Sequence, residues 1–163
     1  MYRVNVITLS DSGYAGQRED KSGPVIAQMA REAGLNVVAS LLLPDDRQQL
    51  KDELCRLCDQ GLTDLVLTTG GTGFSPRDVT PEATLDAVER LAPGIPEAMR
   101  ALSMQITDRA MLSRAVAGIR GQTLIINLPG SPKAVAECLH FILPAVMHGL
   151  DILCEQAQNC ARQ

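Results

Sequence analysis

The run from Gly70 to Glu82, GGTGFSPRDVTPE, contains residue types that suit the binding of a phosphate. Closely spaced glycines let backbone N–H groups approach a ligand because no Cβ stands in the way. Thr80 followed by Pro81 is typical of an N-cap and a first helical residue, and a helix N-terminus favours an anion. We therefore predict a nucleotide-binding turn made by four residues: Gly70, Gly71, Thr72 and Gly73.

An acid inside the same run restricts what the turn can bind. Asp78 would repel a bare phosphate, so its presence favours a ligand that arrives with a hard cation such as Mg²⁺. The spacing matches neither the GxxxxGK[ST] phosphate loop nor the GxGxxG dinucleotide fingerprint. A glycine-rich turn between a strand and a helix can also be purely structural, and that alternative stays open for this motif alone. Together, the turn and the acid indicate a nucleoside triphosphate.

Composition limits the classes of protein that the chain can belong to. Its 163 residues are 45% apolar and 21% charged, which suits one globular domain over residues 1–163. A formal charge of -4 argues against a nucleic-acid partner and against an anionic membrane surface. We expect no apolar stretch near the ~20 residues that span a bilayer, and the first residues lack the profile of a signal peptide. The protein is therefore expected to be cytoplasmic.

Cysteine and histidine offer little catalytic chemistry here. The cysteines are five, an odd number that suits reduced thiols rather than a disulfide framework. Cys55 and Cys58 have CxxC spacing, but no second pair completes a zinc site, so core packing is favoured for Cys58. The two histidines, His140 and His148, both fall on the last expected helix. A histidine-based catalytic triad is therefore not expected.

Strand and helix patterns alternate along the chain. Strands are expected at 3–9, 35–43 and 64–69, and helices at 24–33, 47–58 and 81–91. The second strand is a continuous apolar run, typical of a strand buried on both faces. A helix at 96–105 follows, then strands at 113–119 and 123–128 that indicate a hairpin, and a last helix from Ser131. The pattern predicts a single three-layer α/β domain, with a mainly parallel open sheet, an antiparallel edge hairpin and helices on both faces.

Polar residues follow the expected strands, at the edge where an open α/β sheet binds its ligands. The strand ends carry Asp11, the pair Asp45 and Asp46, the run 70–78 and the run 127–132. Helices that begin near Ser22, Thr80 and Ser131 would direct their N-terminal N–H groups toward the same crevice.

Each of these residues also has a structural alternative. Asp45, Asp46 and Ser131 could serve only as helix caps, and Asn127 could stabilise a turn by bonding to its own backbone. Four basic residues, taken singly, are expected to be solvated charges: Arg77, Arg114, Arg120 and Lys133. For Asp78 a functional role is the favoured interpretation, because a carboxylate beside a phosphate turn needs a cation or a proton to offset its charge.

Three segments, in order, match a known family. LSDSGYAGQREDKSGP, GGTGFSPRDVTPEAT and AMLSRAVAGIRGQTLIINLPGSPKAVAEC closely resemble the molybdopterin adenylyltransferases of molybdenum cofactor synthesis, the MogA/MoaB family. The resemblance covers about residues 4–150. It implies the transfer of AMP from Mg-ATP to the terminal phosphate of molybdopterin, with release of pyrophosphate.

The resemblance also implies roles for particular residues. Asp45 and Asp78 match the family's acidic residues tied to catalysis and Mg²⁺, and residues 70–73 match its nucleotide loop. The implied substrate-binding set is Asp11, Ser22, Gly23, Ser113, Asn127, Pro129, Gly130 and Ser131. Two small departures stand out, because Asp46 replaces a frequent Glu and Ser131 replaces a frequent Asn or Gln.

Partners follow from the resemblance as well. It implies a homotrimer that binds molybdopterin and ATP and hands its product to a molybdenum insertase. One alternative is a catalytically silent relative that carries molybdopterin, although both Asp45 and Asp78 are present. A second alternative, a nucleotide-dependent oxidoreductase, is disfavoured because the dinucleotide fingerprint is absent.

Overall fold

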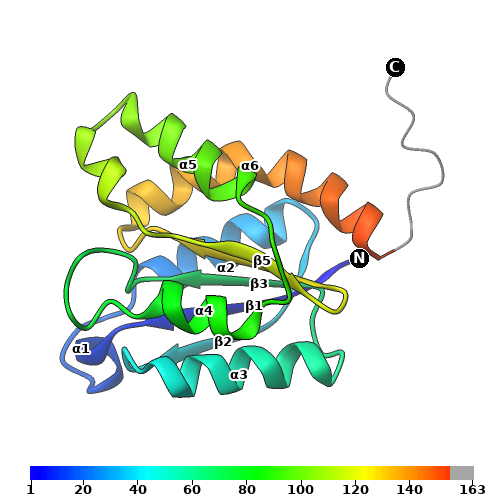
Figure 1. Ribbon diagram of the computed structural model, residues 1–163, viewed down its shortest axis with the longest axis horizontal. Helices are drawn as coiled ribbons and strands as arrows, with labels where there is room; N and C mark the ends of the chain where they lie inside the picture. The colour runs from blue at the N-terminus through cyan, green and yellow to red at the C-terminus, as the bar shows by residue number, and fades with distance from the viewer. Residues whose placement is uncertain (155–163) are drawn as a thin grey trace.

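A six-stranded sheet lies between two layers of helices in the computed structural model, which describes residues 1–154 (Figure 1). The strand order is β2-β1-β3-β6-β5-β4, and neighbours are parallel from β2 through β6. β5 runs antiparallel to β6, and β4 runs antiparallel to β5. The strands are β1 (Arg3–Leu9), β2 (Asn36–Leu43), β3 (Leu65–Thr69), β4 (Arg90–Leu91), β5 (Ala117–Arg120) and β6 (Thr123–Leu128). The predicted fold class is confirmed.

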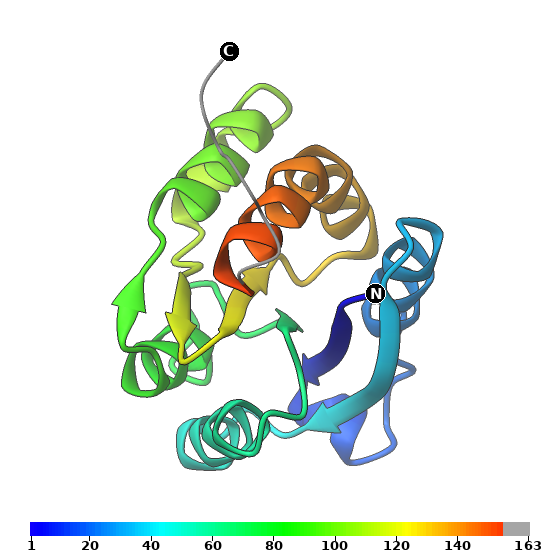
Figure 2. The same ribbon diagram turned by 90° about the vertical axis from the view of Figure 1, so that its right-hand side faces the viewer.

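The helices form two groups, one on each face of the sheet (Figure 2). α3 and α4 pack together on one face, and α2, α5 and α6 cover the other. A short helix and a 3₁₀ turn lie in the connections. The helices are α1 (Asp11–Tyr14), α2 (Ser22–Glu32), α3 (Arg47–Asp59), α4 (Thr80–Ala87), α5 (Gly94–Met104), η1 (Asp108–Leu112) and α6 (Pro132–Leu153).

Side chains alternate in direction along the central strands, so each face of the sheet forms a separate hydrophobic core with the helices that cover it. In β3, Leu65 and Leu67 belong to the core beneath α2 and α6, whereas Val66 belongs to the core beneath α3 and α4. β6 divides in the same way, with Ile126 on the first side and Ile125 on the second. Both faces of these strands are covered, so their residues are buried, and most of the side chains are apolar, as is typical of buried parallel strands.

Two expected elements differ from the structure at the sheet's edges. The expectation that 35–43 is buried on both faces is wrong, because β2 is an edge strand and Val38 is 52% exposed. The helix expected at 81–91 ends at Ala87, and Arg90–Leu91 pairs with β5 as the other edge strand. Backbone N–H groups of Glu89 and Ala92 donate to β5 carbonyls, which replaces the last helical turn with a ladder. β5 itself begins at Ala117, later than the expected 113.

α6 corrects the expectation that no segment is long and apolar enough to span a membrane. Among residues 1–154 it is the one helix that passes such a test on length and composition. Its apolar face packs into the core, where Leu139, Val146 and Leu150 are at most 2% exposed. Such packing is what the core helix of a globular domain shows. The end of the predicted 1–163 domain, from residue 155 on, lies outside the described residues.

Candidate active site

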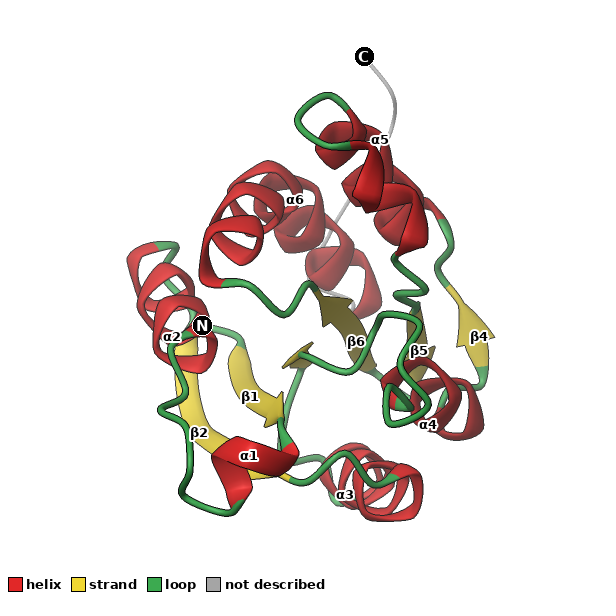
Figure 3. Ribbon diagram, turned by 90° about the vertical axis from the view of Figure 1, so that its left-hand side faces the viewer, coloured by secondary structure: helices red, strands yellow, loops and turns green. Residues whose placement is uncertain are grey.

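The carboxyl ends of β1, β2, β3 and β6 meet at one edge of the sheet, which faces the viewer in Figure 3. Asp11 and Asp45 join the first two ends by reciprocal bonds. Asp11 N donates to Asp45 Oδ2 at 3.0 Å, and Asp45 N donates to Asp11 Oδ1 at 3.0 Å. At the other end of the crevice, Thr69 Oγ1 donates to the Pro129 carbonyl at 2.6 Å. Polar residues predicted to converge from different strands therefore lie side by side.

The glycine turn after β3 adopts a backbone that side chains would not permit. Gly70 has φ +91° and Gly71 has φ +67°, both in the left-handed region. A Cβ on Gly70 would lie 2.3 Å from the Leu9 carbonyl oxygen, so the turn packs directly on the end of β1. Thr80 does not cap α4 as predicted, since its hydroxyl donates to the Gly70 carbonyl at 2.9 Å instead. Thr80 thus ties the turn to the start of α4.

The two predicted acids, Asp45 and Asp78, both lie against this turn. A Cβ on Gly71 would be 3.1 Å from Asp45 Oδ1, and a Cβ on Gly73 would be 2.9 Å from Asp78 Oδ2. Burial raises the pKa of Asp45, and the charges of Asp11 and Asp78 raise it further. The other candidate cap, Asp46, does cap a helix, because it accepts from Gln49 N at 2.8 Å. Asp45 is thereby left free of the capping role.

Arg77 links the glycine turn to the end of β1. Its guanidinium donates to both carboxylate oxygens of Asp11, at 2.9 and 3.0 Å, although the side chain is 64% exposed. This ion pair lowers the pKa of Asp11. Arg77 is therefore more than the solvated charge that its sequence position indicated, because it brings a positive charge beside the paired acids.

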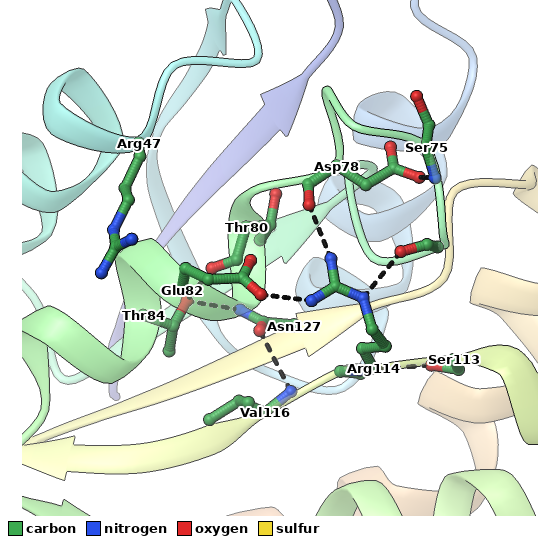
Figure 4. A network of polar contacts seen from close by, with 12 residues as sticks. Arg47, Ser75, Asp78, Thr80, Glu82, Thr84, Ser113, Arg114, Val116 and Asn127 are labelled. Atoms are coloured by element: carbon green, nitrogen blue, oxygen red, sulfur yellow. Dashed lines mark hydrogen bonds and ion pairs between the residues drawn. The ribbon is translucent and has the colours of Figure 1, made fainter.

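Arg114 also differs from the expected solvated charge (Figure 4). Its Nε donates to the Gly73 carbonyl at 2.8 Å, its Nη2 donates to the Asp78 carbonyl at 2.6 Å, and its Nη1 donates to Glu82 Oε1. It lies in the motif segment AMLSRAVAG, which was the only signal in the sequence that could have singled it out. Arg120 is paired too, with Asp59 and the Ala87 carbonyl, whereas Lys133 is exposed.

Asn127 lies beneath the crevice and does not line it. Its side chain is fully buried, and its Nδ2 donates to the hydroxyls of Thr68 and Thr84, each at 2.9 Å. Its Oδ1 accepts from Val116 N at 3.1 Å, which holds the segment that leads into β5 (Figure 4). In this structure the predicted substrate contact is thus replaced by an internal one, and the predicted bond to its own turn is absent.

A hollow of about 620 Å³ opens on one side of the glycine turn, between the starts of α2 and α6. Ser22, Gly130 and Ser131 line it, as does Gly70. Ser22 Oγ donates to the Gly130 carbonyl at 2.7 Å, and Ser131 caps α6 by accepting from Ala134 N at 3.2 Å. This hollow therefore brings together three of the predicted substrate-binding residues.

Asp20 is a residue of this hollow that sequence reasoning missed. Its Oδ1 accepts from Ser22 N and Gly23 N, each at 3.0 Å, and its Oδ2 accepts from Thr8 Oγ1 at 2.7 Å. A Cβ on Gly23 would lie 2.4 Å from Asp20 Oδ2, so the glycine is needed to admit the carboxylate. The carboxylate of Asp20 thereby offsets the positive end of the helix dipole at the start of α2, whereas the start of α6 carries only a serine cap.

A second hollow of about 290 Å³ opens on the other side of the turn, toward α5 and η1. Most of its lining is apolar, and Ser113, Pro129 and Gly130 belong to it. The predicted site residues in its lining are Thr72, Gly73, Ser113, Pro129 and Gly130. Gly130 borders both hollows, and the Gly70–Gly73 turn runs between them. The site can therefore receive two ligands whose ends meet at one turn.

Comparison with known proteins places this arrangement in a family. Residues 5–148 match the family described as a probable molybdopterin binding domain. Molybdopterin adenylyltransferase from Helicobacter pylori strain 26695 is 41% identical over 152 residues, which cover 92% of this chain and 86% of that protein. The Escherichia coli K12 enzyme of the same name is 40% identical over 154 residues, which cover 91% of this chain and 79% of that protein.

Solved structures agree with these matches. The molybdopterin biosynthesis enzyme MoaB from Thermus thermophilus superposes with a TM-score of 0.88 at 44% identity, covering 94% of this chain and 96% of that one. The tungsten cofactor synthesizing protein MoaB from Pyrococcus furiosus has a TM-score of 0.84 at 36% identity, covering 94% and 97%. The chain therefore belongs to the probable molybdopterin binding domain family of molybdenum cofactor biosynthesis.

Proposed function

We propose that this protein is a molybdopterin adenylyltransferase, which transfers AMP from ATP to the terminal phosphate of molybdopterin. In this reaction a terminal phosphate oxygen of molybdopterin forms a bond to the α-phosphorus of ATP, and the bond to pyrophosphate breaks. The observation that carries the proposal is the placement of Asp45 and Asp78 against one glycine turn, with a hollow on each side. Two substrates that react through their phosphates need two adjoining sites of this kind.

The chain's own groups suit a reaction that depends on position and charge. Gly70 and Gly71 are held by the contact with Leu9 and by Thr80, so the backbone N–H groups at the start of the turn offer preorganised donors for phosphate oxygens. Arg77 places a guanidinium beside the same turn. Phosphoryl-type transfer needs no covalent intermediate with the protein, so the proposed reaction does not call for a cysteine or histidine nucleophile.

A Mg²⁺ ion fits the acids of this site. Within residues 1–154 no group of three or more His, Cys, Asp or Glu side chains gathers in a metal-binding arrangement. Magnesium usually takes only one or two protein carboxylates and completes its shell with water and substrate phosphates. Asp45 and Asp78 would hold the ion, which would supply neutralisation of the triphosphate charge. Burial chiefly raises the pKa of Asp45, and the charges of Asp11 and Asp78 add to that effect, which a cation beside these carboxylates would oppose.

Assembly and location complete the proposal. A groove of about 420 Å³ between α5 and α6 is lined by apolar residues such as Ile95 and Ile142, and Phe141 at its rim is 52% exposed. This apolar surface supports association of the chain with itself, and we propose a homotrimer. Light scattering on the purified protein tests the trimer. We further propose that the enzyme acts in the cytoplasm and passes adenylylated molybdopterin to a molybdenum insertase.

The decisive experiment is incubation of the purified protein with molybdopterin, ATP and Mg²⁺, followed by mass analysis of the pterin. We expect the pterin to gain the mass of one AMP. Asp78→Asn is expected to fold normally and to lose several orders of magnitude in turnover. Asp52→Asn, at an exposed position of α3, is the matched control and should keep full activity.

Two results would change the assignment. Tight binding of molybdopterin by the unaltered protein with no AMP transfer would identify a carrier and end the enzyme proposal. Full activity in Asp78→Asn would remove the proposed metal role of that carboxylate while leaving the enzyme in place.

A further inference from the structure

Residues 72–78, which lead from the glycine turn toward α4, form few hydrogen bonds with the rest of the protein. Four residues of this stretch are exposed, and Phe74 is 69% exposed. Asp78 and Ser75 bond to each other, which shapes the stretch internally but does not attach it to the sheet. Among the hydrogen bonds of residues 1–154, those that leave the stretch for other segments go to Asp11 and to Arg114. The position of Asp78 therefore depends on very few contacts.

Arg114 holds both ends of the stretch at once. Its backbone N donates to the Thr72 carbonyl at 2.9 Å, and its guanidinium reaches the carbonyls of Gly73 and Asp78 at 2.8 and 2.6 Å. In Figure 4 the guanidinium lies between the stretch and the first turn of α4. A planar guanidinium presents several donors in a fixed fork, which a lysine ammonium cannot reproduce. Arg114 thereby sets the distance between the two ends of the stretch.

Glu82 fixes the guanidinium in turn. Its Oε1 accepts from Arg114 Nη1, while its Oε2 is buried with no hydrogen-bond partner. Burial raises the pKa of Glu82, but the hydrogen bond from Arg114 and its charge outweigh that effect, so the net pKa is lowered. A charged carboxylate in the first turn of α4 is also favoured by the helix dipole. Arg114 is thus held in one orientation by an ion pair that rests on α4.

We propose that Arg114 is a positioning residue for AMP transfer, which holds the 72–78 stretch so that the Asp78 carboxylate and the turn's N–H groups meet Mg-ATP. This inference rests on the proposed function. All three assigned guanidinium bonds go to protein groups, so Arg114 acts through the turn and does not need to touch a substrate. Its loss should therefore weaken the use of Mg²⁺ and ATP more than the use of molybdopterin.

The test compares Arg114→Ala, Arg114→Lys and the matched control Arg120→Ala. Arg120 also donates to a carboxylate and to a helix carbonyl, those of Asp59 and Ala87, but it does not contact the glycine turn. Displacement of a catalytic group by about 1 Å can cost about 100-fold, and we expect a loss of that size in kcat/KM for ATP in Arg114→Ala. The Mg²⁺ concentration for half-maximal rate should rise, while the KM for molybdopterin and the constants of Arg120→Ala stay near wild type.

Chemical rescue separates positioning from a general loss of structure. Guanidinium chloride, at concentrations far below those that unfold the protein, should restore at least a tenth of the lost activity to Arg114→Ala. Urea and sodium chloride at the same concentrations should restore none, and Arg114→Lys should recover only part of the activity. If Arg114→Ala fails to fold, Glu82→Gln supplies the second variant, since it keeps an acceptor for Nη1 and removes the charge that orients the guanidinium.

Two kinetic results would overturn the inference. Wild-type constants for Mg²⁺ and ATP in Arg114→Ala would do so, as would an equal loss in every constant without rescue by guanidinium. Calorimetric binding of Mg-ATP in the absence of molybdopterin keeps the inference apart from the proposed function. If the wild type binds Mg-ATP more tightly than Arg114→Ala but transfers no AMP, the proposed function fails, while the role of Arg114 in placing the 72–78 stretch for Mg-ATP stands. If the wild type binds no Mg-ATP, both fail.

Discussion

Gly70→Ala tests whether the glycine turn is shaped by direct contact with the end of β1. Gly70 has φ +91°, and a Cβ built there would lie 2.3 Å from the Leu9 carbonyl oxygen. That oxygen belongs to the backbone at the end of β1, so it cannot move aside as a flexible side chain would. To admit the methyl group, β1 and β3 must separate near the pair Thr8 and Thr69.

Two costs add up in this variant. An L-residue in the left-handed region costs about 1–2 kcal/mol relative to glycine. Overpacking against a rigid neighbour costs roughly 1–3 kcal/mol more. Gly34→Ala is the matched control, because Gly34 has φ +83° but a Cβ added there would have no atom within 4 Å, so it carries only the first cost. At about 2–4 °C per kcal/mol for a chain of this length, Gly70→Ala should lower Tm by roughly 4–20 °C and Gly34→Ala by roughly 2–8 °C.

Thermal unfolding at one protein concentration, with urea unfolding as a second measure, gives the comparison. The expected result is a larger loss for Gly70→Ala than for Gly34→Ala, by about 1–3 kcal/mol. Equal losses in the two variants would refute the reasoning, because they would show that the contact with Leu9 carries no cost beyond the backbone conformation.

The remaining predictions concern Asp45 and Asn127. Because the pKa of Asp45 is raised in the folded protein, the unfolding free energy falls as the pH rises through the window above the usual Asp value, and Asp45→Asn should be more stable than wild type at pH 7 yet inactive. Urea unfolding at pH 7 checks this, and a less stable Asp45→Asn would contradict it. Asn127→Ala removes the acceptor of the part-buried Val116 N–H and the donor to the buried Thr68 and Thr84 hydroxyls, so it should cost about 3 kcal/mol, against about 1 kcal/mol for the exposed cap change Ser131→Ala. Chemical denaturation of both variants, with equal losses as the contrary result, tests the difference.

Much of the site could be predicted because strand direction and strand ends are local properties of the chain. The apolar runs followed by Asp11 and Asp45 give parallel strands whose acids must share an edge, and each of these acids does accept a hydrogen bond from the backbone N–H of the other. The glycines of the turn were equally accessible to sequence reasoning. Their positive φ angles and their close approach to Leu9 and Thr80 are what glycine permits and other residues do not.

Strand order was beyond local pattern, and the errors at the sheet's edges follow from that. The apolar run of β2 reads like a central strand, but only β1 pairs with it, so Val38 faces solvent. The segment after α4 has a helical pattern, yet Arg90 and Leu91 pair with β5 because that strand's outer edge is free to accept them. In both places the deciding partner lies far away in the sequence.

Asn127 and Arg114 both lie in surroundings other than those expected, and the reason is the direction of their side chains. In β6 the alternation that buries Ile126 beneath α6 turns Asn127 toward α4, where Thr84 is fully buried. Arg114 precedes β5 and so escapes that alternation, which lets its long side chain reach over the glycine turn. A polar residue in a ligand-binding motif can either contact the ligand or hold the backbone that does, and residue type alone does not separate the two. The hydrogen-bond partners distinguish these two roles. Amide groups that are already paired inside the protein are not available to a substrate. A guanidinium that donates to the carbonyls of Gly73 and Asp78 controls where the Asp78 carboxylate lies.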